Sequence, residues 1–138
     1  MNRPGQSRPA SGNELSPTFD EGYLDIDHWP TAWRVESADL ARGKVMVDLF
    51  KVFLTEQLNL PRSRKTLRVH RNNLHVLGGQ MIRLWHEKPH RRKRGILRIL
   101  LEEIGDDGGP LIYPRLSEAE QRSLDSTCRL LHRFTTLP

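Results

Sequence analysis

The sequence has little of several features that would point to particular classes of protein. Its 138 residues include one cysteine, Cys128, which excludes an internal disulfide and a metal site built from cysteines. No run approaches the roughly eighteen apolar residues of a membrane-spanning helix, and the chain does not start with the basic-then-apolar pattern of a secretion signal. We therefore predict a cytoplasmic protein that has no membrane partner.

Acidic residues are nearly absent from one long stretch of the chain. Residues 61–98 contain twelve Lys and Arg but only one acid, Glu87, whereas the net charge of the whole chain is +5. The remaining residues are therefore net acidic by six. Solubility requires a moderate net charge but does not require the positive charges to lie together. The segregation indicates a polyanionic partner, most often a nucleic acid.

Apolar residues recur with helical spacing in four segments, and no segment alternates as a strand does. In the first segment, Met46, Leu49, Phe50 and Phe53 stand at i, i+3, i+4 and i+7, which gives a wide apolar stripe. The pattern predicts an all-α fold, a single four-helix domain with short loops. The expected helices run from about Asp39 to Leu58, from Ser63 to about Glu87, from after Gly95 to Gly105, and from Ser117 through Phe134.

Helix boundaries also carry signals in the sequence. Glu36 or Ser37 before the first helix and Asp39 in its first turn suit a helix start, and Ser63 suits the N-cap of the second helix. Ser117 and Glu120 have the spacing of a capping box. Gly78-Gly79 lies inside the second helix, where each glycine costs about 1 kcal/mol relative to alanine. The pair therefore indicates either the close approach of another helix, or a kink or a break between two shorter helices.

The domain organisation follows from composition. Residues 1–30 are rich in proline, serine and glycine and become acidic after Asn13, so we expect a disordered acidic tail. The tail either competes with a nucleic acid for the basic stretch or serves only solubility. Residues 31–138 form the expected helical domain, with Trp29, Trp33 and Val35 packing the chain onto it. Leu131 and Phe134 should join the phenylalanines of the first helix in the core.

The basic residues of the second helix fall along one flank, beside its apolar face, and a basic connector follows the helix. Cations ahead of the third helix oppose its macrodipole, so local stability does not explain the connector. We expect these residues to bind nucleic acid, the cations through phosphates and the asparagines and histidine through base edges or sugars. The predicted contacts are Arg64, Lys65, Arg68, Arg71, Asn72, Asn73, His75, Arg83, Arg91, Arg92, Lys93 and Arg94.

Residues with catalytic or metal-binding chemistry do not form a recognisable constellation. His70 and His75 are five residues apart and do not share a helix face, and Pro89 lies between His86 and His90. Glu102 and Glu103 are adjacent, and Cys128 lies on an apolar face. The sequence predicts a protein that is not an enzyme and that has no metal ion or cofactor.

The order of the segments resembles the core-binding domain of tyrosine recombinases, an N-terminal four-helix module that grips DNA. The resemblance covers about residues 40–137. It lies in Phe53-Leu54, the Ser63–Thr66 helix opening, Leu74 and Leu77, and Ser126-Thr127 ahead of Leu130, Leu131 and Phe134. In that family a catalytic domain with a nucleophilic tyrosine follows, whereas this chain ends at Pro138. The resemblance implies a DNA-binding module without the chemistry, accessory to a recombinase or a mobile element.

Three functions remain open at the level of sequence. The first is a non-catalytic DNA-binding protein that clamps the phosphates of double-stranded DNA. The second is a protein-interaction adaptor of a larger assembly, which docks on a protein subunit through its basic face. RNA is the third possible partner, disfavoured by the shortage of aromatic residues for stacking. A basic surface without a partner is the simplest alternative.

Overall fold

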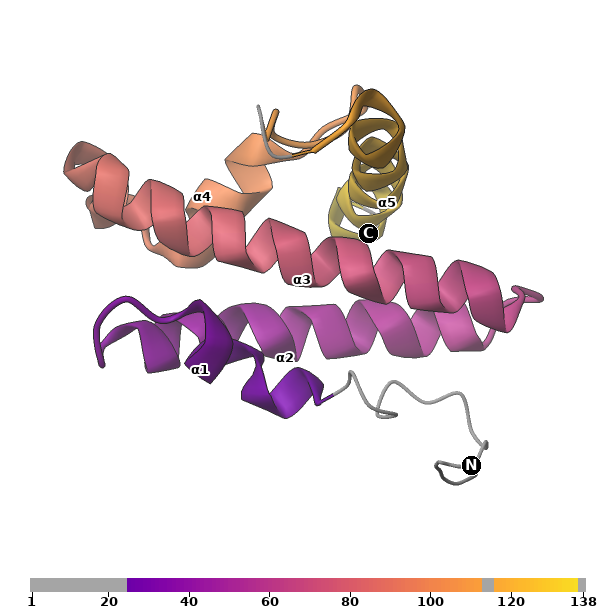
Figure 1. Cartoon of the computed structure of the whole chain (residues 1–138), viewed down its shortest axis with the longest axis horizontal. Coiled ribbons are helices and arrows are strands. Elements are labelled where there is room, and N and C mark those ends of the chain that lie inside the picture. The colour runs from indigo at the N-terminus through magenta and orange to yellow at the C-terminus, as the bar shows by residue number, and fades with distance from the viewer. Residues whose placement is uncertain (1–24, 113–115, 137–138) are drawn as a thin grey trace.

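The computed structural model describes residues 25–112 and 116–136, and within these residues every regular element is helical (Figure 1). The four predicted helices are confirmed as α2 to α5, and a short helix, α1, and two 3-10 helices, η1 and η2, accompany them. The elements are η1 (Ile26–His28), α1 (Trp29–Trp33), α2 (Asp39–Leu58), α3 (Arg64–Glu87), η2 (Pro89–Arg94), α4 (Ile96–Glu103) and α5 (Glu118–Thr136).

Helix α3 is central to the fold. It runs beside α2 in the opposite direction, and α4 and α5 pack on its other side (Figure 1). Helix α1 contacts both α2 and α3. At 1.5 Å per residue, the 24 residues of α3 make it about 36 Å long. Only one flank of α3 is left facing solvent.

The core consists of the predicted apolar stripes. Phe50, Phe53, Leu74 and Leu131 are all completely buried, and each such side chain stabilises the fold by about 1.5–3 kcal/mol. Phe134 is half-buried, with its ring 5.6 Å from that of Phe53. The helical spacing therefore identified the core residues. Phe134, near the end of α5, packs at the edge of the core and stays partly exposed.

The predicted helix starts are mostly confirmed. The Ser63 hydroxyl accepts a hydrogen bond from the Thr66 amide at 3.0 Å, and Ser117 and Glu120 bond each other's backbone amides at 2.9 and 3.1 Å. For α2 the predicted cap is wrong. Ala38 precedes the helix without a side-chain cap, and the amides of Asp39 and Leu40 donate to backbone carbonyls. The Asp39 carboxylate, in the first turn as predicted, accepts from the amides of Val35 and Glu36 and so holds the segment before the helix.

Gly78 and Gly79 make room for an aromatic side chain. A Cβ atom added at Gly78 would lie 2.3 Å from the Trp33 ring, and one added at Gly79 would lie 3.3 Å from it. The Trp33 Nε1–H donates to the carbonyl oxygen of His75 at 2.9 Å. Close approach is therefore confirmed, although the approaching group is a side chain of α1. A break into two shorter helices is wrong, because α3 is continuous from Arg64 to Glu87.

The start of the domain lies earlier than predicted. Ile26, Trp29 and Pro30 are buried, and Asp27 pairs with Lys51 of α2, so the boundary at residue 30 cuts through packed structure. Val35 is 72 % exposed and does not pack on the domain as expected. Its amide, not its side chain, is the anchored group. The expected disorder of the tail concerns mainly residues 1–24, which lie outside the described residues.

Candidate nucleic-acid interface

The solvent-facing flank of α3 carries four of the predicted contacts. Lys65, Arg68, Asn72 and Arg83 are exposed, and at 100° per residue they fall within about 60° of one another around the helix. Lys65 and Arg83 are about 27 Å apart along its axis. We call Lys65, Arg68, Asn72 and Arg83 the outer flank. Its three cations form no ion pair with any described residue.

Arg64, in the first turn of α3, is exposed close to the outer flank. Arg71, by contrast, is only 4 % exposed, so the prediction of a surface contact there is wrong. The buried face of α3 is wider than the apolar stripe in the sequence, because α1, α2, α4 and α5 all pack against this helix. A position at the edge of the stripe is therefore buried even when an arginine occupies it.

Asn73 turns towards α5. Its side-chain amide donates to the Ser123 carbonyl at 3.0 Å, to the Ser123 hydroxyl at 3.0 Å and to the Thr127 hydroxyl at 2.9 Å. The same Thr127 hydroxyl lies 2.8 Å from Nδ1 of His70. Asn73 therefore joins α3 to α5 through its amide nitrogen, and its contact with nucleic acid stays a prediction. Burial also lowers the pKa of His70, which favours its neutral form at the helix interface.

His75 is half-buried against α1. Its ring lies 5.1 Å from that of Trp29 in an edge-on arrangement and 5.9 Å from that of Trp33. Burial lowers its pKa below the ordinary value, so the ring is neutral at pH 7. His75 therefore adds no charge to the outer flank, and its role is to hold α1 against α3.

The connector becomes η2, and its arginines are engaged by the protein. Arg91 donates to Glu103 at 2.9 Å and to Glu102 at 3.1 Å, and Arg94 donates to Glu102 at 2.8 Å. Arg92 donates to the Trp85 carbonyl at 3.0 Å, with its guanidinium 5.7 Å from the centre of the Trp85 ring. Lys93 is exposed and forms no ion pair with a described residue. Of the four predicted phosphate contacts in η2, Lys93 is the most available.

One polar network was not predicted from the sequence. The buried Asp39 carboxylate receives hydrogen bonds from two amides and from Arg42, and His86 Nε2 lies 2.9 Å from it. Burial alone would raise the pKa of Asp39, but the hydrogen bonds from Val35, His86, Glu36 and Arg42 outweigh it and lower the pKa to about 2. Asp39 and Arg42 have the i, i+3 spacing of a helix pair, whereas nothing in the sequence connects them to His86.

The same network contains three side chains with metal-ligand chemistry. One ligand atom each from Glu36, Asp39 and His86 lies within 4.8 Å of the others. However, the Arg42 guanidinium bonds both carboxylates and lies 4.4 Å from the centre of the Trp85 ring. The cluster already holds a cation, so we interpret it as a structural connection between α2 and α3.

No protein-family model matches the chain, and no curated protein or solved structure matches it. The resemblance to the core-binding domain of tyrosine recombinases therefore stays a prediction. Within residues 25–112 and 116–136, no helix combines the length and the apolar content that crossing a bilayer requires.

Proposed function

We propose that this protein binds double-stranded DNA through the outer flank of α3 and carries out no chemistry on it. The observation that carries the proposal is the set of exposed cations Lys65, Arg68 and Arg83 on one side of one helix, without acidic partners among the described residues. Cations that the fold does not neutralise favour a polyanion, because binding releases the counterions condensed on it.

The composition of the exposed side of α3 favours contact with the DNA backbone. Side chains read the sequence only where they reach base edges, whereas Lys and Arg contacts to phosphates fix the position of a protein on the duplex. Here α1, α2, α4 and α5 cover α3 on its other sides. The cations of the outer flank therefore bind phosphates, and Asn72 is the one predicted base or sugar contact that remains exposed on this helix.

Lys93 of η2, which follows α3 in the chain, is a further exposed cation that could contact phosphates. Together with Lys65, Arg68 and Arg83 it gives four cations without a described acidic partner, so the logarithm of the binding constant should fall with the logarithm of the salt concentration with a slope of about −4. Arg92 and Arg94 are exposed and can add to this value, whereas Arg91 is largely covered and bonded to two glutamates.

The proposal of a non-catalytic function is supported by the state of the nucleophile and base candidates. Burial raises the pKa of the Cys128 thiol to about 12, so the reactive thiolate is scarce at neutral pH. His70 and His75 are held within helix interfaces. Of these groups only His75 borders a hollow, and no described residue forms a hydrogen bond to its ring that could activate it.

The decisive experiment measures duplex binding as a function of salt for Lys65→Ala/Arg68→Ala. We expect the slope to become less steep by about two units, one for each lost phosphate contact. Lys44→Ala is the matched control, because Lys44 is an exposed cation of α2 that pairs with Asp48 at 3.4 Å. Binding that does not depend on salt, or equal slopes for the two variants, would refute the phosphate mechanism.

A protein-interaction adaptor is the second candidate function. Val69 is 37 % exposed on the same helix as the outer flank, and Leu111 is 73 % exposed, so the basic surface adjoins apolar groups of the kind that protein partners cover. An adaptor would bind one acidic protein and discriminate against nucleic acids in general. Parallel titrations with duplex DNA, structured RNA and single strands separate this candidate and an RNA-binding role from the proposal. A role accessory to a recombinase follows only from the resemblance.

A further inference from the structure

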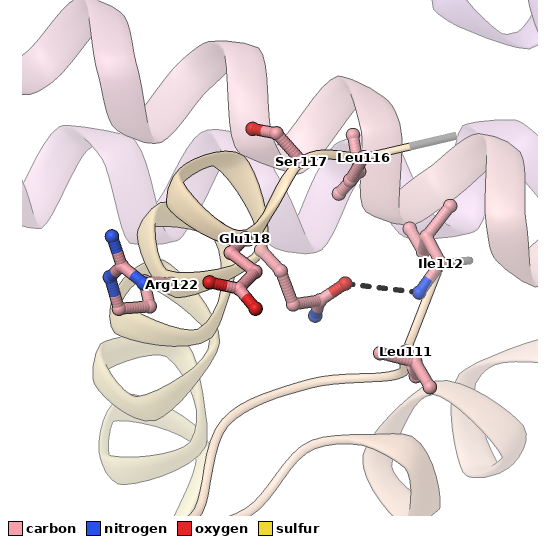
Figure 2. Close-up of a pocket in the computed structure, with 7 residues that line it drawn as sticks. Leu111, Ile112, Leu116, Ser117, Glu118 and Arg122 are labelled. Carbon is pink, nitrogen blue, oxygen red and sulfur yellow. Dashed lines mark hydrogen bonds between the residues drawn. The ribbon is translucent and has the colours of Figure 1, made fainter. Parts of the chain in front are cut away.

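Two hollows adjoin the middle of the outer flank and share one wall. The first, of about 330 Å³, lies between α1, α3 and the segment before α5, and it is lined by Trp33, His75, Val76, Gly79, Gln80, Arg83, Ile112 and Leu116. The second, of about 270 Å³, lies between that segment and the first turns of α5 (Figure 2). Ile112 and Leu116 belong to both hollows. We call the pair the α3–α5 groove.

Hydrogen bonds fix both sides of the groove. Gln121 accepts from the Ile112 amide at 3.0 Å and donates to the Pro110 carbonyl at 2.9 Å, so the wall is held to α5 (Figure 2). On the other side, Trp33 is held in the notch of Gly78 and Gly79 by its bond to His75. These bonds hold Ile112 and Trp33, two of the residues that line the groove, in position.

The surface of the groove is apolar with cations at its margins. Ile112 is 4 % exposed and lies deep, whereas Leu111 is 73 % exposed at the rim. Arg83 of the outer flank lines the first hollow, and Arg122 lines the second beside Glu118 (Figure 2). A groove of this kind favours an acidic segment with large apolar side chains.

The chain itself contains such a segment next to its first described residue. Residues 14–24 include three acids and no Lys or Arg, together with the apolar residues Leu15, Phe19, Tyr23 and Leu24. Asp25 follows directly and leads through η1 into α1, whose last residue is Trp33. Eight residues of helix cover at most about 16 Å, and the six residues from Phe19 to Leu24 can span about 20 Å when extended. The segment can therefore reach the groove.

We propose that residues 14–24 bind in the α3–α5 groove of the same chain and thereby shield the outer flank from DNA. Phe19 and Tyr23 supply apolar side chains to the groove, and Asp20 and Glu21 approach Arg83 and its neighbours. The regulatory part of this inference rests on the proposed DNA binding, whereas the docking itself does not.

Covalent attachment makes even weak docking effective. A short flexible connection gives an effective concentration in the millimolar range, so a segment with an intrinsic affinity of about 0.1 mM would be bound roughly ten times more often than free. DNA would then bind only to the open fraction, and the apparent affinity for DNA would fall about tenfold.

The docking is tested by attaching a nitroxide label to Thr18→Cys in the full chain. The native Cys128 is buried, with a pKa of about 12, and should not react. We expect the label to broaden the amide resonances of Val76, Gly79 and Leu116 but not those of Val45 and Val52 on the exposed side of α2. Leu111→Glu, an exposed rim substitution that places an acid beside the acidic segment, should remove the broadening. Broadening that is absent, or that is equal on both sides, would overturn the inference.

The regulatory effect is measured by the duplex affinity of Phe19→Ala/Tyr23→Ala in the full chain, with Ser7→Ala/Ser11→Ala as the control. We expect the first variant to bind DNA about tenfold more tightly and the control to bind as the parent does. Selective broadening in a chain that never binds DNA would refute the proposed function and leave the docking intact. DNA binding without selective broadening, or unchanged affinity in the aromatic variant, would refute the shielding and leave the proposed function intact.

Discussion

The two sides of α3 use the same residue types for opposite purposes. On the outer flank, Asn72 and Arg68 face solvent, whereas Asn73 and Arg71 are turned into the fold. Asn73 alone makes three hydrogen bonds to α5. A polar side chain on this helix therefore contributes either to stability or to binding, and its angular position decides which.

The largest expected effect concerns the buried carboxylate of Asp39, which connects α2 to α3 through His86. Asp39→Asn keeps the shape of the side chain but removes the charge that receives the bonds of His86 and Arg42. A pKa of about 2 in place of 3.8 corresponds to about 2 kcal/mol of stability, so we expect the variant to lose about that amount at pH 7. Urea denaturation followed by circular dichroism measures the loss.

The same substitution predicts a pH dependence. Because the folded pKa of Asp39 is lowered, its contribution to the free energy of unfolding is complete above about pH 4 and disappears as the pH falls through 2. The difference between Asp39→Asn and the parent should shrink over this range. Asp48→Asn, which changes an exposed carboxylate, is the control and should have little effect. A difference that is constant from pH 7 to pH 2 would contradict the lowered pKa.

The adjacent asparagines give the sharpest comparison of the two sides. Asn73→Ala removes the bonds to Ser123 and Thr127 and should lower the free energy of unfolding by about 1 kcal/mol, whereas Asn72→Ala should change it by less than about 0.5 kcal/mol. In DNA binding the order should reverse, with Asn72→Ala altering the preference among sequences. Thermal melts and gel shifts on both variants test this. Equal loss of stability at the two positions would remove the distinction between the sides.

The smallest expected effect separates two cations of η2. Lys93→Ala should make the salt dependence of DNA binding less steep by about one unit, because the lysine is exposed and forms no ion pair with a described residue. Arg91→Ala should leave the slope almost unchanged, because that guanidinium bonds Glu102 and Glu103. If Arg91→Ala had the larger effect on the slope, the paired arginines would be the phosphate contacts.

Most of the fold could be predicted from the sequence, because it depends on signals that are local along the chain. The i, i+3, i+4, i+7 spacing around Phe50 located α2, and Ser63 and Ser117 marked the starts of α3 and α5. The start of the domain was placed too late because η1 and α1 are short. Three- and five-residue helices provide too little periodicity to be distinguished from a tail.

The interface was harder to predict. The sequence shows where basic residues cluster, but it does not show which acidic residues lie next to them in the fold. The arginines of η2 are basic in composition, yet Glu102 and Glu103 fold back on them from the end of α4. Likewise, the width of the buried face of α3 depends on how many elements pack against this helix. Because four helices do so, Arg71 is buried. Neither the pairing of the η2 arginines nor the burial of Arg71 can be read from the residues within one helical turn of these arginines.

The Trp33 notch has a consequence for the order of folding. A helix of five residues is far too short to persist alone, so α1 gains its structure from the surface on which it docks. That surface, the notch at Gly78 and Gly79, exists only after α3 has formed and its carbonyl at His75 is in place. Helix α1 should therefore be the last element to fold and the first to detach, and the indole proton of Trp33 should exchange with solvent faster than the core amides of α3.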